Sequence, residues 1–252
     1  MQDRYAGDIG DYGKIGLLRA LQSQGLSVGI NWYRVDPPEV EKKTDGTFKQ
    51  ADGKYLIPDA LMICDEDLAD ILTGIAKSGN RSVEALEKAG LVPGACYYHD
   101  FLTVDQRTEW HEQAMKELKD TDIVFVDPDN GMLVRSVGKR SARSVKYMLY
   151  EEVRDYIRRG QSVLIYNHRS RKPERKYFHE ICSRLQEATG VPESDILKIT
   201  FPKYSVRDYL AVPSSEDHRR KIEAAFTAME KGVWGQMGMS RIPRKEESQN
   251  AI

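Results

Sequence analysis

The sequence predicts an α/β fold, in which a mostly parallel sheet carries helices on both faces and an antiparallel pair of strands at its end. Helical and strand patterns alternate along the 252 residues, which is typical of parallel sheets. The run IVFV at 123–126 is apolar throughout, as expected of a strand that is buried on both faces. The last two strand patterns are separated by only four residues, which is too few for a parallel crossover.

Each element is assigned from the spacing of its apolar residues and from the turn residues that flank it. Two Asp-Gly pairs between 41 and 57 predict a hairpin, which belongs to an insertion at about 37–94. The expected helices lie at 11–25, 65–78, 82–89, 107–120, 141–159, 173–189 and 216–231. The expected strands lie at 26–35, 95–102, 122–127, 161–168, 196–202 and 207–214.

The composition limits the class of protein. The chain has 38 basic and 39 acidic residues, and a net charge of -1 excludes a uniformly basic nucleic-acid-binding surface. No apolar run approaches the roughly 18 to 20 residues of a membrane-spanning helix, so we expect a soluble, cytoplasmic protein that does not bind membranes. The three cysteines lack CxxC spacing, which argues against a disulfide framework or a zinc site. We expect one domain over 1–240 and a loose tail over 241–252.

Polar residues follow two buried strands of the predicted sheet. Asp127, Asp129 and Asn130 come directly after the apolar run at 123–126, and His168 ends the strand pattern at 161–168. In open α/β sheets ligands bind at the carboxyl ends of the strands. These four side chains are therefore the predicted catalytic residues.

The stretch GDIGDYGK at 7–14 precedes the first predicted helix. Its glycines recur at every third position, but the spacing is not that of a phosphate-binding P-loop, and Asp8 and Asp11 would repel a phosphate. Two carboxylates suit a cationic ligand or a metal ion, whereas Lys14 suits a carboxylate or phosphate. The alternative is structural, because aspartate is a favourable N-cap for a helix.

Positive charge is concentrated in two stretches, at 135–146 and at 169–176. Both lie close to the two strands that carry the predicted catalytic residues. Such patches are typical of polyanion binding, although a solvated surface gives the same pattern. The residues that we expect to bind a polyanionic substrate are Arg140, Arg169, Arg171 and Lys172.

The second half of the chain resembles class I S-adenosylmethionine-dependent methyltransferases, which have a Rossmann-like sheet. In that family the fourth strand ends in a motif of the type Asp-Pro-Pro-Tyr, and here DPDN stands at 127–130, so that the first two positions match and the last two differ. The start RYAGDIGDYGKIGLL is similar to the segment before the first strand of ribosomal RNA adenine-N6 methyltransferases. The chain also resembles a group of bacterial and phage proteins that share GDIGDYGK, NWY and DPDNG.

The resemblance implies a group-transfer enzyme of methyltransferase type that acts on a nucleic acid or nucleotide, with S-adenosylmethionine as cofactor. Asp127 would accept a hydrogen bond from an exocyclic amine of the substrate. No Gly-x-Gly loop follows the first strand, and no aromatic residue at position 130 is present to stack on a base. The residues expected to hold the cofactor are Asp8, Asp11, Lys14, Asp36 and Asp100.

Two alternatives follow from the same residues. Asp127 and Asp129, with Asp8 or Asp11, would hold Mg²⁺ or Mn²⁺ in a nuclease or in a phosphoryl- or glycosyl-transfer enzyme. The remaining hypothesis is a non-catalytic protein that binds a nucleotide or nucleic acid through the basic segment NHRSRKPERK at 167–176.

Overall fold

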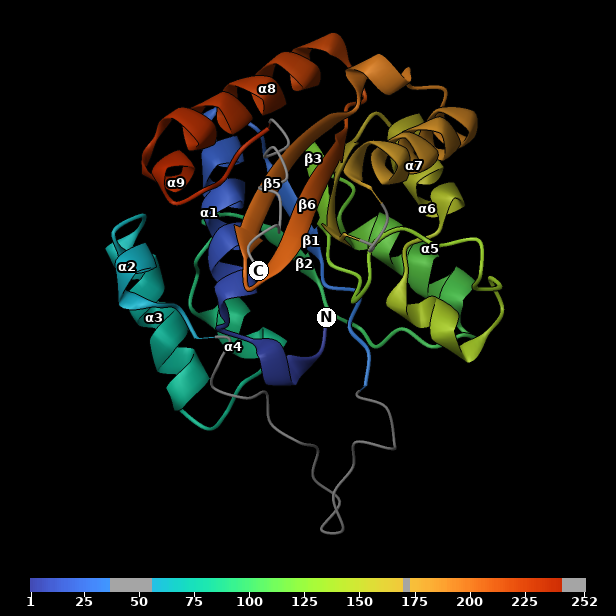
Figure 1. Ribbon diagram of the computed structural model, residues 1–252. Helices are drawn as coiled ribbons and strands as arrows, with labels where there is room; N and C mark the ends of the chain where they lie inside the picture. The colour runs from blue at the N-terminus through green and yellow to red at the C-terminus, as the bar shows by residue number, and fades with distance from the viewer. Residues whose placement is uncertain (37–55, 170–172, 242–252) are drawn as a thin grey trace, which may run out of the picture.

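The computed structural model describes residues 1–36, 56–169 and 173–241, and these form a single six-stranded sheet (Figure 1). The strands follow the order β2-β1-β3-β4-β6-β5, and β2, β1, β3 and β4 are parallel. Strand β6 runs antiparallel to β4 on one side and to β5 on the other. Their bounds are β1 Val28–Asn31, β2 Cys96–Tyr98, β3 Ile123–Val126, β4 Ser162–His168, β5 Leu197–Lys203 and β6 Ser205–Val212. The predicted α/β fold and antiparallel last pair are confirmed, in a Rossmann-like layout.

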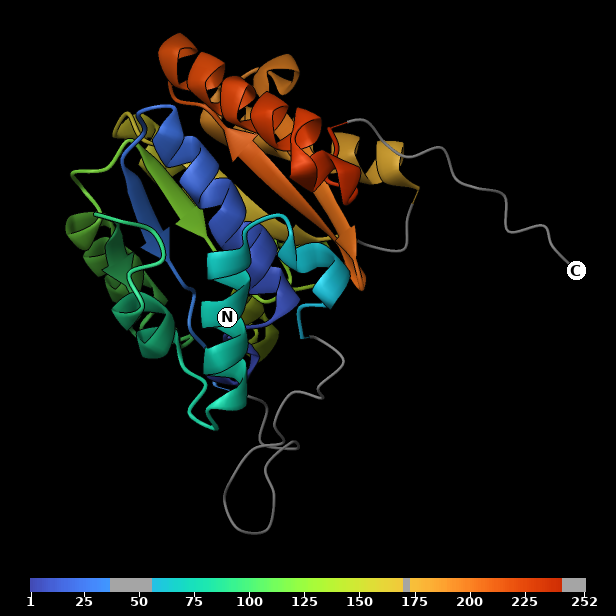
Figure 2. The same cartoon turned by 90° about the vertical axis from the view of Figure 1, so that its left-hand side faces the viewer.

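Helices cover both faces of the sheet (Figures 1 and 2). One face packs on α1, α3, α4 and α8, and the other on α5, α6 and α7. The longer helices are α1 Ile9–Ser23, α3 Glu66–Lys77, α4 Val83–Lys88, α5 Arg107–Glu117, α6 Tyr150–Arg158, α7 Glu174–Thr189 and α8 Glu216–Lys231. The short ones are η1 Asp3–Tyr5, α2 Asp59–Met62, η4 Ala142–Lys146, η5 Glu193–Asp195 and α9 Val233–Gln236. Among the described helices, none combines the length and the apolar character needed to cross a bilayer.

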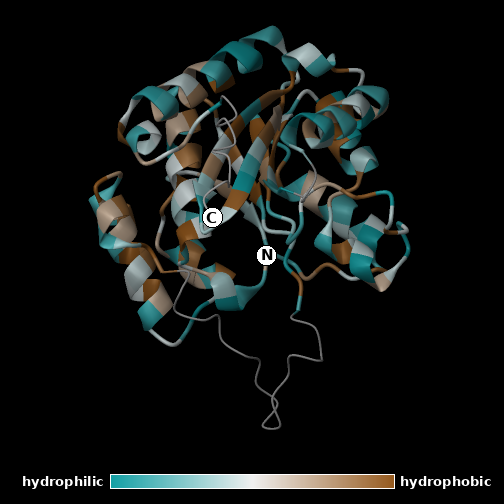
Figure 3. Cartoon of the chain, viewed as in Figure 1, coloured by the Kyte–Doolittle hydropathy of each residue, from teal (hydrophilic) through white to brown (hydrophobic). Residues whose placement is uncertain are grey.

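The central strands are apolar throughout because each side chain is covered by one of the two helix layers. Ile123 and Phe125 belong to the hydrophobic cluster beneath α1 and α8, whereas Val124 and Val126 belong to the cluster beneath α5, α6 and α7. Successive side chains of a strand point to opposite faces, so a strand between two helix layers has no polar face. Figure 3 shows hydrophobic stretches within the sheet, with hydrophilic stretches on β5 and β6 as well, and hydrophilic residues on the outer sides of α7 and α8.

The expected helix at 141–159 is wrong in its first half. The structure has the 3-10 helix η4 at Ala142–Lys146, then extended backbone at Tyr147 and Leu149, and only then α6. The guanidinium of Arg107 donates to the carbonyl oxygens of Ser144 and Tyr147, at 3.0 and 2.7 Å. The Tyr147 carbonyl is therefore bound by a side chain from another helix, α5, and the Ser144 carbonyl accepts both this side chain and the backbone N–H of Tyr147.

The other sequence-based elements differ from the structure mainly in their ends. The strand expected at 26–35 shortens to β1, which ends two residues before Tyr33, whose backbone has a positive φ of 47°. The strand expected at 95–102 shortens to β2. The hairpin expected at 41–57 falls largely outside the described residues, as do Arg171, Lys172 and the tail beyond 241.

The direction of α1 places its first turn at the carboxyl edge of the sheet. Helix α1 packs on the face of β1, and only four residues, 24–27, connect the two elements. The helix must therefore run opposite to the strand, so that it begins where the parallel strands end. Strand β6, being antiparallel, also begins at this edge.

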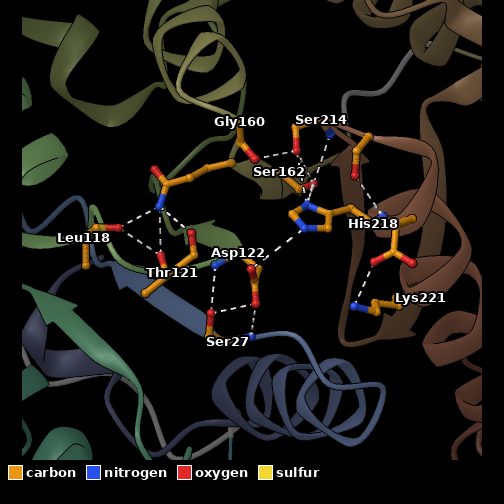
Figure 4. A network of polar contacts seen from close by, with 12 residues as sticks. Ser27, Leu118, Thr121, Asp122, Gly160, Ser162, Ser214, His218 and Lys221 are labelled. Atoms are coloured by element: carbon orange, nitrogen blue, oxygen red, sulfur yellow. Dashed lines mark hydrogen bonds and ion pairs between the residues drawn. The ribbon is translucent and has the colours of Figure 1, made fainter.

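The opposite edge of the sheet carries a polar network that joins four elements (Figure 4). Ser162 Oγ lies 2.9 Å from His218 Nδ1, and His218 Nε2 lies 3.8 Å from Asp122 Oδ1. The backbone N–H and the hydroxyl of Ser27 donate to Asp122 Oδ2, at 2.8 and 2.7 Å. Ser162 is 0% exposed, so no substrate reaches its hydroxyl. We interpret this Ser-His-Asp set as structural, because it connects the first residues of the strands to α8.

Candidate functional site

A cavity of about 380 Å³ opens at the carboxyl edge of the sheet. It lies where α1 begins, where β3 and β4 end, and where β6 begins. Asp8 and Lys14 enter it from α1, Asp127 follows β3, His168 ends β4, and Arg207 enters from β6. The volume falls in the range of small-molecule sites, which is about 300 to 1,000 Å³.

The structure brings the two predicted acidic segments together. Asp8 lines the cavity with Asp127 and Asp129, although the segments lie far apart in the chain. Asn130, His168 and Lys14 line it as well, so all four predicted catalytic residues share one site. Asp11 is 0% exposed and lies behind Lys14.

Lys14 is the centre of a buried charge cluster. Its Nζ lies 2.6 Å from Asp127 Oδ2 and 2.7 Å from Asp11 Oδ1, and 4.8 Å from the centre of the Tyr166 ring. Burial disfavours the lysine charge, but the carboxylates of Asp11 and Asp127 outweigh it and hold the pKa of Lys14 well above 10.5. Burial in turn raises the pKa of Asp127, and Lys14 only partly offsets this.

Asp8 caps α1 and faces the cavity at the same time. Its Oδ1 accepts hydrogen bonds from the backbone N–H groups of Gly10 and Asp11, at 2.7 and 3.0 Å. Asp8 therefore serves as the helix N-cap, which was the structural alternative for this residue. Burial, followed by repulsion from Asp11, raises the pKa of Asp8 to about 6, so this carboxyl group titrates closer to neutral pH than an ordinary aspartate.

His168 presents a neutral imidazole to the cavity. Its ring meets the Tyr166 ring edge-on, with 5.2 Å between centroids, and forms no hydrogen bond to another described residue. Burial, with the positive charges of Arg207 and Lys14, lowers the pKa of His168 to about 4. At neutral pH the ring therefore offers one donor and one acceptor nitrogen to a ligand.

The DPDNG loop is held in place by backbone and side-chain contacts. The side chain of Gln2 donates to Asp129 Oδ2 at 2.6 Å, and the backbone N–H of Asn130 donates to the carbonyl of Lys146 at 2.9 Å. Gly131 has a φ of +90°, and a Cβ placed there would lie 2.1 Å from Asn167 Oδ1. That oxygen accepts the backbone N–H of Met132 at 3.1 Å, which fixes the exit of the loop.

Sequence reasoning missed Arg207, which lines the cavity. Arg207, only 3% exposed, donates through Nε to the hydroxyl of Tyr166. Arg207 pairs with His168 in the β4–β6 register, so the neighbouring strand brings its guanidinium to the predicted site. The available signal was the pair of charged residues in RDYLAV, because a charged side chain at the start of an otherwise buried strand requires partners.

Several predicted residues do not join the site. Asp36 and Asp100 are exposed, and neither lines the cavity. Arg140 lies at a different cavity, beside α5 and α6. Arg169 binds Asp208 through two hydrogen bonds of 2.9 and 2.6 Å and Glu174 through a third of 2.7 Å, which commits its guanidinium to the fold. Lys146, and neither Arg140 nor Arg169, lines the cavity near the DPDNG loop.

The glycine spacing in GDIGDYGK has a packing cause. A Cβ at Gly13 would lie 2.7 Å from the Phe201 ring, and one at Gly16 would lie 2.4 Å from the Trp234 ring. Residues three apart lie on one face of a helix, so this glycine face lets α1 approach β5 and α9 closely. The close packing of α1 therefore explains Gly13, and the same face continues at Gly16 beyond the motif.

The metal alternative finds little support in the described residues. They contain no cluster of three or more His, Cys, Asp or Glu side chains arranged to hold a metal ion. Lys14 Nζ stands between Asp11 and Asp127, where a cation bound to both would lie.

Comparison with known proteins gives no family: no family model matches the chain, and no curated protein matches it.

Proposed function

We propose that the protein is a group-transfer enzyme acting on a nucleotide or nucleic acid, and that the cavity binds the phosphate-bearing acceptor. The observation that carries this proposal is the charge of the cavity wall. Among the described residues, four basic side chains line it, Arg4, Lys14, Lys146 and Arg207, against three carboxylates. Lys14 pairs with Asp127, which leaves three basic side chains against two carboxylates in the cavity wall. This surplus of positive charge favours an anionic ligand.

Lys146 is the basic side chain best placed to meet a phosphate. It is 31% exposed, and its Nζ lies 3.8 Å from Asp129 Oδ2, so it is held near the cavity without a short ion pair. Arg207 lies deeper, at the start of β6. These two cations favour a ligand orientation in which the phosphate lies at the rim of the cavity and the reacting group lies deeper.

Asp8 and His168 supply the proton chemistry. Transfer of a group to a nitrogen or oxygen atom releases a proton from the acceptor, which a nearby base must take. With a pKa of about 6, Asp8 is mostly ionised at neutral pH yet basic enough to accept this proton. His168, neutral with a pKa of about 4, is suited to orienting the acceptor by a hydrogen bond.

The cavity is a poor fit for S-adenosylmethionine itself. The sulfonium and ammonium groups of that molecule would meet Lys146 and Arg207, whereas Asp127 is committed to Lys14. The remaining predicted cofactor residues, Asp36 and Asp100, follow β1 and β2 and lie outside the cavity. S-adenosylmethionine as the methyl donor stays a prediction that the resemblance implies.

Titration calorimetry tests the proposal with adenosine 5′-monophosphate and a decathymidylate strand as probes. Lys146→Gln should weaken binding of both probes and lower the salt dependence of strand binding by about one unit of slope. Lys139→Gln is the matched control, because Lys139 is 57% exposed and lines a different cavity. Unchanged affinity in the Lys146 variant, or saturable binding of adenosylmethionine alone, would count against the proposal.

A further inference from the structure

Tyr204 lines the cavity and has a backbone conformation that does not stabilise the fold. It is the single residue between β5 and β6, since Lys203 pairs with Ser205. Its φ of 59° lies in the left-handed region that favours glycine, and its side chain is 60% exposed. Both the backbone and the exposed ring are unfavourable for a tyrosine, which directs attention to a function.

Arg207 fixes the hairpin tip that carries Tyr204. Its Nη1 donates to the carbonyl oxygens of Lys203 and Ser205, at 2.6 and 3.1 Å. Its Nε donates to the Tyr166 hydroxyl, which lies on β4. The tip is therefore attached to the floor of the cavity by a buried guanidinium, and Tyr204 and Ser205 both line the cavity.

We propose that Tyr204 stacks on the base of the nucleotide or nucleic acid substrate. An exposed aromatic ring beside a surplus of cationic groups matches a ligand that carries a planar base and a phosphate. Asn130, also in the cavity wall, offers a side-chain amide with a donor and an acceptor for a base edge. Position 130 carries no aromatic ring, and Tyr204 supplies one from the turn between β5 and β6.

This inference rests on the proposed function and narrows the substrate to one with an unpaired base. The critical substitution is Tyr204→Gly. Glycine is favoured at this φ, so the variant should fold at least as stably as the wild type while it loses the ring. Tyr204→Phe is the matched control, because it keeps the ring and removes only the hydroxyl.

Affinities for adenosine 5′-monophosphate and for ribose 5-phosphate, which lacks the base, separate the two proposals. Tyr204→Gly should bind adenosine 5′-monophosphate about 10-fold more weakly and ribose 5-phosphate equally well, while Tyr204→Phe stays within about 2-fold of the wild type. Equal losses for both ligands, or no loss for either, overturn the stacking role and leave the phosphate site standing. If the wild type binds neither ligand, both proposals fail.

Discussion

Lys14 Nζ lies 2.6 Å from Asp127 Oδ2, although 113 positions separate the two residues. The lysine is 4% and the aspartate 2% exposed, and Asp11 completes the cluster at 2.7 Å. This contact joins the first turns of α1 to the end of β3 and so assembles the cavity wall. It also changes how Asp127 variants must be interpreted, because removing this carboxylate leaves Lys14 with one partner fewer and affects stability as well as activity.

Lys14→Met is expected to lower the free energy of unfolding by about 3 to 5 kcal/mol, because it leaves Asp11 and Asp127 buried without their cation. Urea denaturation measures the loss. Adding Asp127→Asn to Lys14→Met should cost less than the sum of the two single changes, since one unpaired charge disappears. Lys139→Met, at an exposed position, is the control. A loss below about 1 kcal/mol for Lys14→Met would show that this cluster contributes little.

Asp8 makes stability fall as the pH rises. Its pKa is about 6 in the fold and 3.8 in the unfolded chain, so the unfolded state ionises first. The stabilisation is complete below pH 3.8 and is lost as the pH passes 6, with a size on the order of 3 kcal/mol. Asp8→Asn keeps a capping side chain and removes this titration. Unfolding free energies of both proteins from pH 4 to 7 should diverge over that window; parallel curves would contradict the raised pKa.

His168 has the opposite effect in nearly the same range. Its pKa is about 4 in the fold and 6.5 in the unfolded chain, so its contribution is present above pH 6.5 and is lost as the pH falls through 4. The C2 proton of His168, assigned in NMR spectra with His168→Gln, should therefore keep its chemical shift between pH 5 and 8. A titration midpoint near 6.5 would place the ring in solvent, in conflict with its partly buried position.

Local sequence patterns predict an element correctly where contacts with neighbouring elements do not change its backbone conformation. Continuous apolar runs predict β3 and the first part of β4, because strands between two helix layers have no polar face. A short connection predicts the antiparallel β5–β6 pair. The break before α6 is not predictable locally, because Arg107 from another helix binds the carbonyls there.

The site divides in the same way. Strand ends and the start of α1 meet at one edge by topology, so the convergence of Asp8 and Asp127 is a consequence of element order. The buried pairing of Lys14, the approach of Arg207 from β6 and the position of Tyr204 depend on which strands are neighbours across the sheet. That adjacency is a three-dimensional property that no single segment of sequence carries.

Gly131 gives a direct test of how the DPDNG loop is held. Its φ is +90°, and an added Cβ would lie 2.1 Å from Asn167 Oδ1, the oxygen that accepts the Met132 backbone N–H. Gly131→Ala should therefore cost several kcal/mol, on the order of 2 to 4 by combining backbone strain with a lost buried hydrogen bond. Gly138→Ala is the matched control in the same connection, because no heavy atom lies within 4 Å of its added Cβ. Urea denaturation compares the two variants, and calorimetry with adenosine 5′-monophosphate tests whether displacement of the loop also weakens the ligand site. Equal stability of the two variants would mean that the loop tolerates a shift and that Asn167 does not fix it.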